Sequence, residues 1–394
     1  MTGCELLVVA GEASGDLHGA RLVAELRRLV PDLETFGLGG EELRAAGLAA
    51  VADSSEVAVV GLTEVWKLLP RIRQVFAALL AEVDRRRPRA ALLIDFPDFN
   101  LRLAGQLKRR GVPVIYYISP QVWAWRRGRV KTIARRVERM LVLFAFEVDF
   151  YRRAGVPAIH VGHPLVDEVP ELPGAWERGR QAGEPYRLAL LPGSRRGEVE
   201  ALLPVMLEAV ALLAARLPLR AAVIKAPAIA RAAIEQAAAR HGVEVEVVTA
   251  ERFAAIADAH LALCASGTAT LEVGLLGTPM VVLYRLASWT YLAARLLVRV
   301  PNFALVNLVL GRAAVPELLQ REASPERVAL EAERLLTDAG ARQRQRGALA
   351  ELRPRLGARG ASARAARQVA DLLAAAAAAV AGGAGGRGTH GEAA

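Results

Sequence analysis

Lysine and cysteine are scarce in this sequence of 394 residues. Only Lys67, Lys108, Lys131 and Lys225 are lysines, although the chain has 51 basic residues, so arginine carries nearly all of the positive charge. The two cysteines, Cys4 and Cys264, match no paired metal-binding or redox spacing. This pattern excludes a disulfide framework and favours a reducing compartment.

Long hydrophobic runs are also missing. No stretch reaches the roughly 20 strongly apolar residues that a bilayer-spanning helix needs. The first apolar run, Leu6 to Ala10, meets Gly11, Glu12 and Asp16, which makes it too short and too acidic for a signal peptide. We therefore expect a cytoplasmic protein, and we expect any association with a membrane to be peripheral.

The excess of positive charge favours an anionic partner. A formal net charge of +10 and a pI near 10.2 suit nucleic acid, a phosphorylated substrate or an acidic membrane surface, and charge alone does not choose among them. His160 and His163 lie three residues apart without further ligands nearby in sequence. We expect no metal site and no cofactor.

Short buried runs alternate with helical patterns along the chain, which predicts parallel sheets with helices on both faces. The expected strands are Leu6 to Ala10, Ala91 to Ile94, Val114 to Ile118, Leu141 to Phe144, Leu188 to Leu191, Ala222 to Ile224, Val245 to Val248, Leu261 to Cys264 and Met280 to Leu283. The fold class is therefore α/β, with two Rossmann-like, doubly wound domains and a helical C-terminus. Ser324 before Pro325 predicts a helix start.

The Pro-, Gly- and Glu-rich stretch from Pro164 to Pro185 separates the two series of strands. We expect the first domain at residues 1–170, a linker at 171–185, the second domain at 186–335, C-terminal helices at 336–380 and a disordered, Gly- and Ala-rich tail at 381–394.

Motifs of a doubly wound fold gather where strands end. The first such run, Gly11 to Asp16, is expected to open a helix at about Leu17. Its small residues, Ser14 and Gly15 among them, let a ligand approach the helix N-terminus. A tight turn capped by Ser14 or Asp16 explains the run equally well.

A later strand delivers Asp95 to the carboxyl edge of the sheet, which is a common way to place a general base in a cleft. Asp98 or Asn100 fits the duty of capping the next helix better. Asp95 is therefore the better catalytic candidate.

The run from Ser119 to Arg127 contains Trp123, Trp125 and Arg126. Tryptophans beside arginines suit stacking on a sugar or a nucleobase, or a position at a membrane interface. A core tryptophan beside a solvated basic face explains at least one of the two.

Two turns of the second domain suit a phosphate. The first contains Gly193, Ser194 and Arg195, where glycine permits close approach and Arg195 can clamp a diphosphate. The second contains Ser266, Gly267 and Thr268, followed by Glu272, which can accept hydrogen bonds from both hydroxyls of a ribose. Arg285 and Asn307 follow further along the chain. Asn307 is also interpretable as a turn residue.

Two basic stretches, Trp66 to Arg87 and Trp289 to Val300, are amphipathic. Ordinary core packing explains most such stripes. Arg71, Arg73 and the run Arg85 to Arg87 make contact with anionic lipid a secondary hypothesis.

Together these motifs resemble the lipid-A-disaccharide synthase family in order and spacing, over about Leu6 to Leu335. The resemblance rests on Gly11 to Asp16, the run at Asp95, Ser119 to Arg126, Gly162-His163-Pro164, Leu190 to Arg195 and Ala265 to Thr268. It implies a glycosyltransferase-B architecture, with two domains facing across a cleft. It also implies a metal-free, inverting hexosyltransferase that joins UDP-2,3-diacylglucosamine and 2,3-diacylglucosamine 1-phosphate into the β-1,6 disaccharide of lipid A and releases UDP.

The resemblance also assigns roles. Asp95 would deprotonate the acceptor hydroxyl and Arg195 would hold the diphosphate, while Glu272 and Asn307 would line the donor site. The full set of expected substrate contacts is Ser14, Gly15, Asp98, Asn100, Trp123, Trp125, Arg126, His163, Gly193, Ser194, Ser266, Gly267, Thr268, Glu272, Arg285 and Asn307. Phe96 stands where the family often has alanine, and Val306 where proline often precedes the asparagine.

Other functions stay open at this stage. A UDP-N-acetylglucosamine epimerase or the peptidoglycan glycosyltransferase would share the fold. A non-catalytic basic module that binds membrane or nucleic acid would share the charge, although the resemblance implies no nucleic acid. It leaves a homodimer open.

Overall fold

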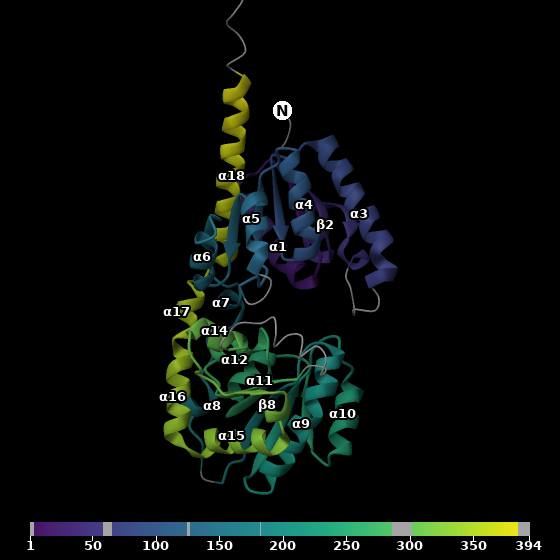
Figure 1. Ribbon diagram of the computed structural model, residues 1–394. Coiled ribbons are helices and arrows are strands. Elements are labelled where there is room, and N and C mark those ends of the chain that lie inside the picture. Colours follow the sequence, from purple (N-terminus) through teal and green to yellow (C-terminus); the bar gives the residue numbers. More distant parts are fainter. Residues whose placement is uncertain (1–3, 58–64, 124–126, 182, 286–301, 385–394) are drawn as a thin grey trace, which may run out of the picture. The chain divides into compact units, whose positions relative to one another are not determined.

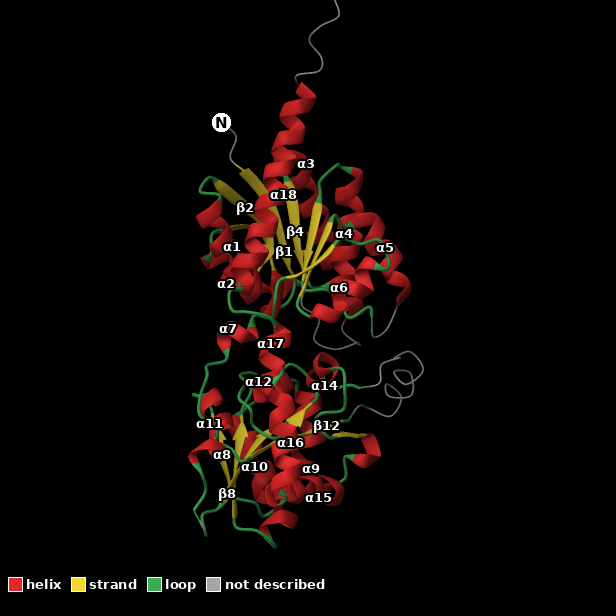
Figure 2. Ribbon diagram, turned by 90° about the vertical axis from the view of Figure 1, so that its left-hand side faces the viewer, coloured by secondary structure: helices red, strands yellow, loops and turns green. Residues whose placement is uncertain are grey.

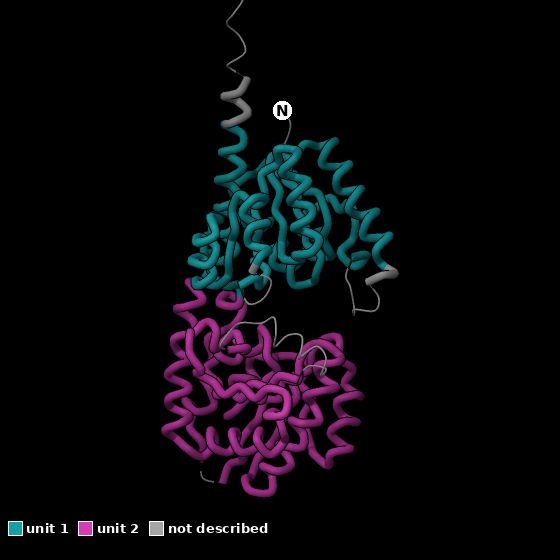
Figure 3. Tube along the Cα trace, viewed as in Figure 1, with its two compact units in different colours: residues 1–164, 359–394 teal, residues 165–358 magenta. Residues whose placement is uncertain are grey.

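The computed structural model describes residues 4–57, 65–123, 127–181, 183–285 and 302–384. The chain divides into two compact units, residues 1–164 with 359–394 and residues 165–358 (Figure 3). Each unit contains one parallel sheet between helices (Figure 2). The predicted α/β class with two Rossmann-like domains and a helical C-terminus is confirmed.

The sheet of the first unit has seven parallel strands in the order β3-β2-β1-β4-β5-β6-β7. The strands are β1 (Cys4–Ala10), β2 (Leu33–Gly39), β3 (Leu48–Asp53), β4 (Ala90–Ile94), β5 (Val114–Tyr117), β6 (Arg139–Val142) and β7 (Ala158–His160). The central β1 and β4 are buried along nearly their whole length. Their last residues, Ala10 and Ile94, are register partners, so the segments that follow them leave the sheet side by side.

Helices cover both faces of this sheet. They are α1 (Ala13–Leu29), α2 (Glu41–Ala45), α3 (Val65–Arg86), α4 (Pro97–Arg109), α5 (Val130–Arg136), α6 (Ala145–Arg152) and α18 (Ala361–Ala384), with short 3-10 turns at Ser54–Glu56 and Arg127–Arg129. Side chains of α3, α4, α5 and α6 form one core with alternate strand residues such as Leu93 and Tyr116. Helices α1 and α18 pack together on the opposite face (Figure 2).

The second unit repeats the arrangement with six parallel strands in the order β10-β9-β8-β11-β12-β13. They are β8 (Tyr186–Leu191), β9 (Leu219–Ile224), β10 (Val245–Val248), β11 (Leu261–Ala265), β12 (Met280–Tyr284) and β13 (Glu317–Leu319). Its helices are α7 (Leu165–Glu168), α8 (Ala175–Arg178), α9 (Arg196–Ala214), α10 (Arg231–Arg240), α11 (Arg252–Asp258), α12 (Ala269–Leu275), α14 (Leu305–Leu310), α15 (Pro325–Thr337), α16 (Ala339–Ala350) and α17 (Leu352–Leu356), with a 3-10 turn at Gln320–Glu322 (Figure 1).

Every strand expected from the sequence is present, and four others lacked a clear signal. Strands β2 and β3 contain glycine, alanine and charged residues, and β7 and β13 have three residues each. The predicted N-cap is confirmed, because the Ser324 hydroxyl accepts a hydrogen bond from the Arg327 amide at 3.3 Å.

The unit boundaries differ from those expected. The first unit ends at Pro164 rather than near residue 170, and residues expected as a linker belong to the second unit. Trp176 of α8 explains this, since its indole N–H donates to the His260 carbonyl at 2.8 Å and its ring packs on His260. Helix α18 returns to the first unit and runs to Ala384, into the segment expected as a tail. The remainder of that segment, 385–394, lies outside the described residues.

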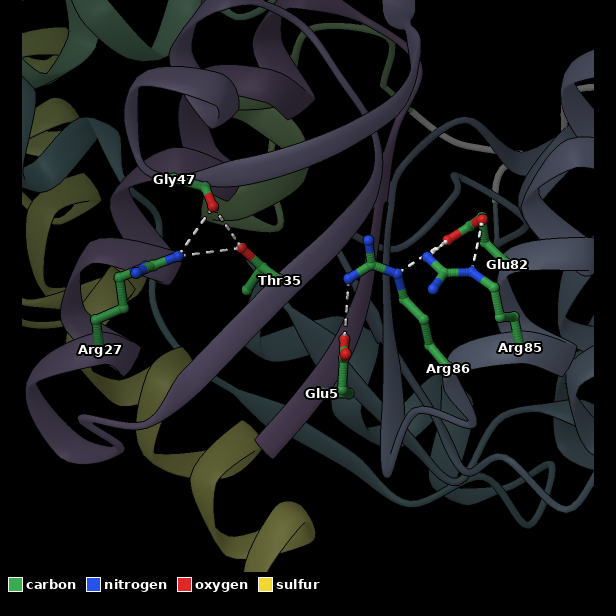
Figure 4. Close-up of polar contacts among 7 residues, drawn as sticks. All are labelled: Glu5, Arg27, Thr35, Gly47, Glu82, Arg85 and Arg86. Carbon is green, nitrogen blue, oxygen red and sulfur yellow. Dashed lines mark hydrogen bonds and ion pairs between the residues drawn. The ribbon is translucent and has the colours of Figure 1, made fainter. Parts of the chain in front are cut away.

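Helix α3 carries the amphipathic stripe that was a candidate for lipid contact. Val75, Leu79 and Val83 are buried in the core of the first unit, so core packing accounts for that part of the stripe. At its C-terminal end, Glu82 lies between Arg85 and Arg86 (Figure 4), whose hydrogen bonds lower the pKa of Glu82 to about 2. The second stretch, Trp289 to Val300, lies outside the described residues.

Figure 4 also locates Arg27 of α1, which donates to the Gly47 carbonyl at 3.0 Å and lies beside Thr35 of β2. Arg86 reaches Glu5 of β1 at 3.5 Å. These contacts tie α1 to β2 and α3 to β1. Within the described part of the chain, no helix is long and apolar enough to cross a membrane.

Candidate functional site

Both sheets reverse their strand order at one point, between β1 and β4 in the first unit and between β8 and β11 in the second. At such a point the connections leave toward opposite faces, which opens a crevice at the carboxyl ends of the strands. The run at Asp95 follows β4, and the turn at Arg195 follows β8. The two residues expected to be catalytic therefore each follow a strand at a switch point.

The turn after β1 approaches the one after β4 closely. A Cβ atom on Gly11 would lie 2.4 Å from the ring of Phe96, so only glycine fits there. Helix α1 begins at Ala13 rather than at Leu17, because Ala13 to Asp16 of this run form its first turn. Ser14 is exposed, whereas Gly15 is buried beside Ile94.

Asp16 caps a different helix from the one expected. Its side chain is buried and accepts hydrogen bonds from the backbone amides of Gly40 at 2.6 Å, Glu42 at 3.0 Å and Leu43 at 3.3 Å. These are amides at the start of α2, which have no partners inside the helix. Asp16 thus joins α2 to α1, and neither Ser14 nor Asp16 caps α1.

Asp95 has the properties of a general base. Burial, followed by repulsion from Glu12, raises the pKa of the Asp95 carboxyl to about 6. A base whose pKa lies near neutral pH takes a proton without being protonated at rest. The backbone is left-handed at Asp95 (φ 45°) and at Phe96 (φ 49°), which is uncommon for residues other than glycine.

Asp98 and Asn100 follow Asp95 in helix α4 and take different positions. Asp98 is exposed and pairs with Arg129. Asn100 is fully buried, and its amide nitrogen donates to the carbonyls of Asp95 at 2.8 Å and Ile94 at 3.1 Å. The Asn100 amide therefore holds the main chain at the end of β4. Neither this contact nor the burial of Asn100 supports the prediction that it contacts substrate.

The segment after β5 contains a buried polar network that sequence reasoning missed. The Ser119 hydroxyl donates to Glu147 of α6 at 2.8 Å, and the Trp123 indole N–H donates to the same carboxyl oxygen at 3.1 Å. The Tyr151 hydroxyl lies 2.9 Å from the Ser119 hydroxyl. Burial raises the pKa of Glu147 to about 7, although these hydrogen bonds oppose the change.

Trp123 is consequently a core residue. It is buried and packs edge-on against Phe146, so stacking on a ligand is not available to it in this conformation. The second tryptophan and the arginine of the motif, Trp125 and Arg126, lie outside the described residues.

His163 follows β7 and is buried beside Phe144, with 5.4 Å between ring centroids. Burial, followed by repulsion from His18 and His160, lowers the pKa of His163 to about 3, so the imidazole is neutral at pH 7. The described residues hold no group of three or more His, Cys, Asp or Glu side chains suited to a metal ion.

In the second unit, the turn after β8 leads into the 19-residue helix α9. Gly193 is left-handed (φ 116°), which favours glycine, and a Cβ there would lie 2.7 Å from the Glu198 carboxylate. The Arg195 side chain is 80% exposed and 3.2 Å from Glu198. The turn therefore places an exposed guanidinium at a helix N-terminus, which suits a diphosphate.

The turn after β11 is partly occupied by its own contacts. The Ser266 hydroxyl donates to the Phe303 carbonyl at 3.3 Å, whereas Thr268 is exposed and Gly267 half-buried. Glu272 pairs with Arg252 at 3.1 Å, and burial raises the pKa of Glu272 although Arg252 opposes the change. Arg285 is half-buried and donates to the Ala323 carbonyl at 2.7 Å.

Asn307 uses its side-chain amide within the protein. It is fully buried, donates to the Val315 carbonyl and to Glu317, and accepts from the amides of Ala314 and Val315, at distances from 2.6 to 3.0 Å. Both halves of its amide are thereby used to fix the loop before β13. Asn307 lies inside helix α14, so it is not the turn residue that the sequence also suggested, and its expected contact with the donor stays a prediction.

Comparison with known proteins extends these findings. Residues 6–370 match the model of the family described as lipid-A-disaccharide synthetase. The lipid-A-disaccharide synthase of Anaeromyxobacter dehalogenans strain 2CP-C is 50% identical over 366 residues, covering 91% of this chain and 95% of that protein. That of Myxococcus xanthus is 48% identical over 364 residues, with the same coverage.

Solved structures show the same fold at low identity. The calicheamicin glycosyltransferase CalG4 has a TM-score of 0.57 at 18% identity, covering 95% of this chain and 99% of that one. MurG of Acinetobacter baumannii has a TM-score of 0.58 at 15% identity, covering 94% and 99%. The resemblance seen in the motifs is thus confirmed over nearly the whole sequence, and the chain belongs to the lipid-A-disaccharide synthetase family of hexosyltransferases, which serve lipid A biosynthesis.

Proposed function

We propose that the chain transfers 2,3-diacylglucosamine from UDP-2,3-diacylglucosamine to the 6-hydroxyl of 2,3-diacylglucosamine 1-phosphate, with inversion. The products are the β-1,6-linked disaccharide 1-phosphate and UDP. The observation that carries the proposal is Asp95, a partly buried carboxyl with its pKa raised to about 6 at the switch point of the first sheet.

Asp95 acts as the general base. The acceptor oxygen forms a bond to the anomeric carbon as the bond from that carbon to the diphosphate oxygen breaks, and the hydroxyl proton passes to the Asp95 carboxylate. One base is enough for inversion, in contrast to the carboxylate pair of a typical glycoside hydrolase. Ser14, at the exposed start of α1, and Asp98, at the start of α4, lie on segments that also leave this edge of the sheet.

Arg195 and the N-terminus of α9 stabilise the departing UDP. Negative charge develops on the diphosphate as the sugar leaves, and a bidentate guanidinium with helix amides meets it without a metal ion. The access required is supported by the 80% exposure of the Arg195 side chain. Gly193 and Ser194 supply the close backbone approach.

Thr268 and Glu272 hold the nucleoside part of the donor. Glu272 accepts hydrogen bonds from the two ribose hydroxyls, and it exchanges its present contact with Arg252 for them. Thr268 and Gly267 are accessible for the remaining contacts. Burial supports this role for Glu272, because a hydrogen bond made away from water is less exposed to competition.

We further propose that the protein works at the inner face of the cytoplasmic membrane. Each methylene of an acyl chain removed from water is worth about 0.8 kcal/mol, so both substrates favour a membrane or an apolar surface. The N-terminal part of α3, with the exposed Arg71 and Arg73, is the candidate contact. A homodimer stays a prediction, to be tested by light scattering.

Two variants separate the proposed roles of Asp95 and Arg195. Asp95→Asn is expected to lower kcat at least about a hundredfold while UDP binding is retained, because only the base is lost. Arg195→Ala is expected to weaken UDP binding by about tenfold or more. Arg196→Ala is the matched control, since Arg196 is 88% exposed and pairs with Glu200. Normal turnover of Asp95→Asn would exclude Asp95 as the base. Equal UDP binding by the parent enzyme, Arg195→Ala and Arg196→Ala would place the diphosphate elsewhere.

A further inference from the structure

The main chain at Asp95 has an unusual conformation that needs support. Asp95 and Phe96 are both left-handed, and so is Ile118 (φ 63°), which follows the neighbouring strand β5. L-residues disfavour this region, so it persists only where the surroundings fix it, and such positions cluster at active sites.

The regular ladder between β4 and β5 ends just before this point. Ile94 and Tyr117 are the last register partners, and the Asp95 amide still donates to the Tyr117 carbonyl at 3.0 Å. Because buried backbone groups rarely stay unpaired, the carbonyls of Ile94 and Asp95 at this strand end also need donors.

Two buried side chains supply those donors. The Tyr116 hydroxyl, from β5, donates to the Asp95 carbonyl. The Asn100 amide, from α4, donates to the same carbonyl at 2.8 Å and to that of Ile94 at 3.1 Å. Both Tyr116 and Asn100 are fully buried.

We infer that Tyr116 and Asn100 are a positioning pair, which holds the strained backbone of Asp95 so that its carboxylate meets the acceptor hydroxyl. The inference rests on the proposed role of Asp95 as the base. It assigns a function to Asn100, in the run that begins at Asp95, and to Tyr116, which lies outside every motif of the sequence. Because a misplacement of about 1 Å can cost about a hundredfold in rate, support of this kind affects catalysis from a buried position.

Tyr116→Phe tests the inference with little risk to folding, since it removes one oxygen and keeps the ring. We expect kcat to fall about tenfold or more while KM and UDP affinity stay within about twofold, because the carboxylate moves but the binding groups do not. The matched control is Tyr117→Phe, which removes a buried hydroxyl from the opposite face of the same strand. It should keep the kcat of the parent enzyme.

The same substitution in an Asp95→Asn background distinguishes positioning from general damage. If Tyr116 acts through the Asp95 carboxylate, Tyr116→Phe lowers kcat no further once that carboxylate is gone. An equal fall in both backgrounds, or no fall in the parent, would overturn the inference. Failure of the proposed role of Asp95 would look different, because Asp95→Asn alone would then keep its turnover whatever Tyr116→Phe does, and failure of the proposed function would leave the parent enzyme without turnover.

Discussion

The Glu198 carboxylate accepts a hydrogen bond from the Ser194 amide at 3.2 Å, in the turn where we propose that the diphosphate of UDP binds. It also accepts from the Arg195 amide at 3.4 Å and lies 3.2 Å from the Arg195 guanidinium. The protein's own carboxylate thus holds the groups that an incoming diphosphate needs. The ligand has to displace it.

Replacing that carboxylate by a neutral amide should therefore tighten UDP binding. Glu198→Gln keeps an oxygen that can cap α9 but removes a negative charge that repels the diphosphate. We expect the dissociation constant of UDP to fall about fivefold, or about 1 kcal/mol, by titration calorimetry. Glu200→Gln, which removes an exposed charge from the same helix, is the control. Weaker binding by Glu198→Gln would mean that its carboxylate supports the site instead.

The pH dependence of the reaction should report Asp95. Its pKa is raised to about 6, and only the ionised form accepts a proton. Consequently, kcat/KM should be level near pH 8 and fall about tenfold per pH unit below about pH 6. Steady-state rates between pH 4.5 and 8.5 check this, in a range where the enzyme is first shown to stay folded. A profile without an acid limb would rule out a base of this pKa.

Glu147 should make the protein less stable as the pH rises. Its folded pKa of about 7 exceeds the ordinary value of 4.5, so the folded state keeps a proton that the unfolded state has lost. Stability is therefore lost between about pH 4.5 and 7. Glu147→Gln keeps the acceptor oxygen without the charge, and its melting temperature relative to the parent should be higher at pH 8 than at pH 4.5.

Thermal unfolding at the two pH values measures this difference. Glu138→Gln, at an exposed carboxyl close in sequence, should show no such change. A difference for Glu147→Gln that is the same at both pH values would show that folding does not raise the pKa of Glu147.

Asp16 should matter for stability. Asp16→Ala leaves the buried amides of Gly40 and Leu43 without an acceptor, which costs about 2–4 kcal/mol in the free energy of unfolding. Chemical denaturation checks this, with Asp32→Ala as an exposed control. A cost below about 0.5 kcal/mol, typical of surface substitutions, would contradict the structural role.

The sequence predicted the positions of Asp95 and Arg195 because both follow strands with uninterrupted apolar runs. Such runs fix burial and strand direction, and direction fixes which edge the next residue reaches. Asp16 was harder, since the amides it caps lie more than 20 residues away, and nothing local distinguishes it from a cap of α1.

The burial of individual polar side chains was the feature that could least be predicted from the sequence. Asn100 and Asn307 both looked like ligand contacts, yet their amides hold the main chain. The network around Glu147 joins residues from different elements, and its burial depends on packing between them. Glu198 had a local signal, because it lies three residues after Arg195, which is the spacing of a capping box. That spacing does not show that the Glu198 carboxylate competes with a ligand for the same groups.

The most direct test of the proposed function is an incubation of the purified protein with UDP-2,3-diacylglucosamine and 2,3-diacylglucosamine 1-phosphate in detergent with EDTA. UDP release and disaccharide are followed together by mass, and the new linkage by NMR. The account predicts one UDP for each β-1,6-linked disaccharide, at a rate that EDTA does not change. UDP without disaccharide, an α-linked product or no release of UDP would contradict it.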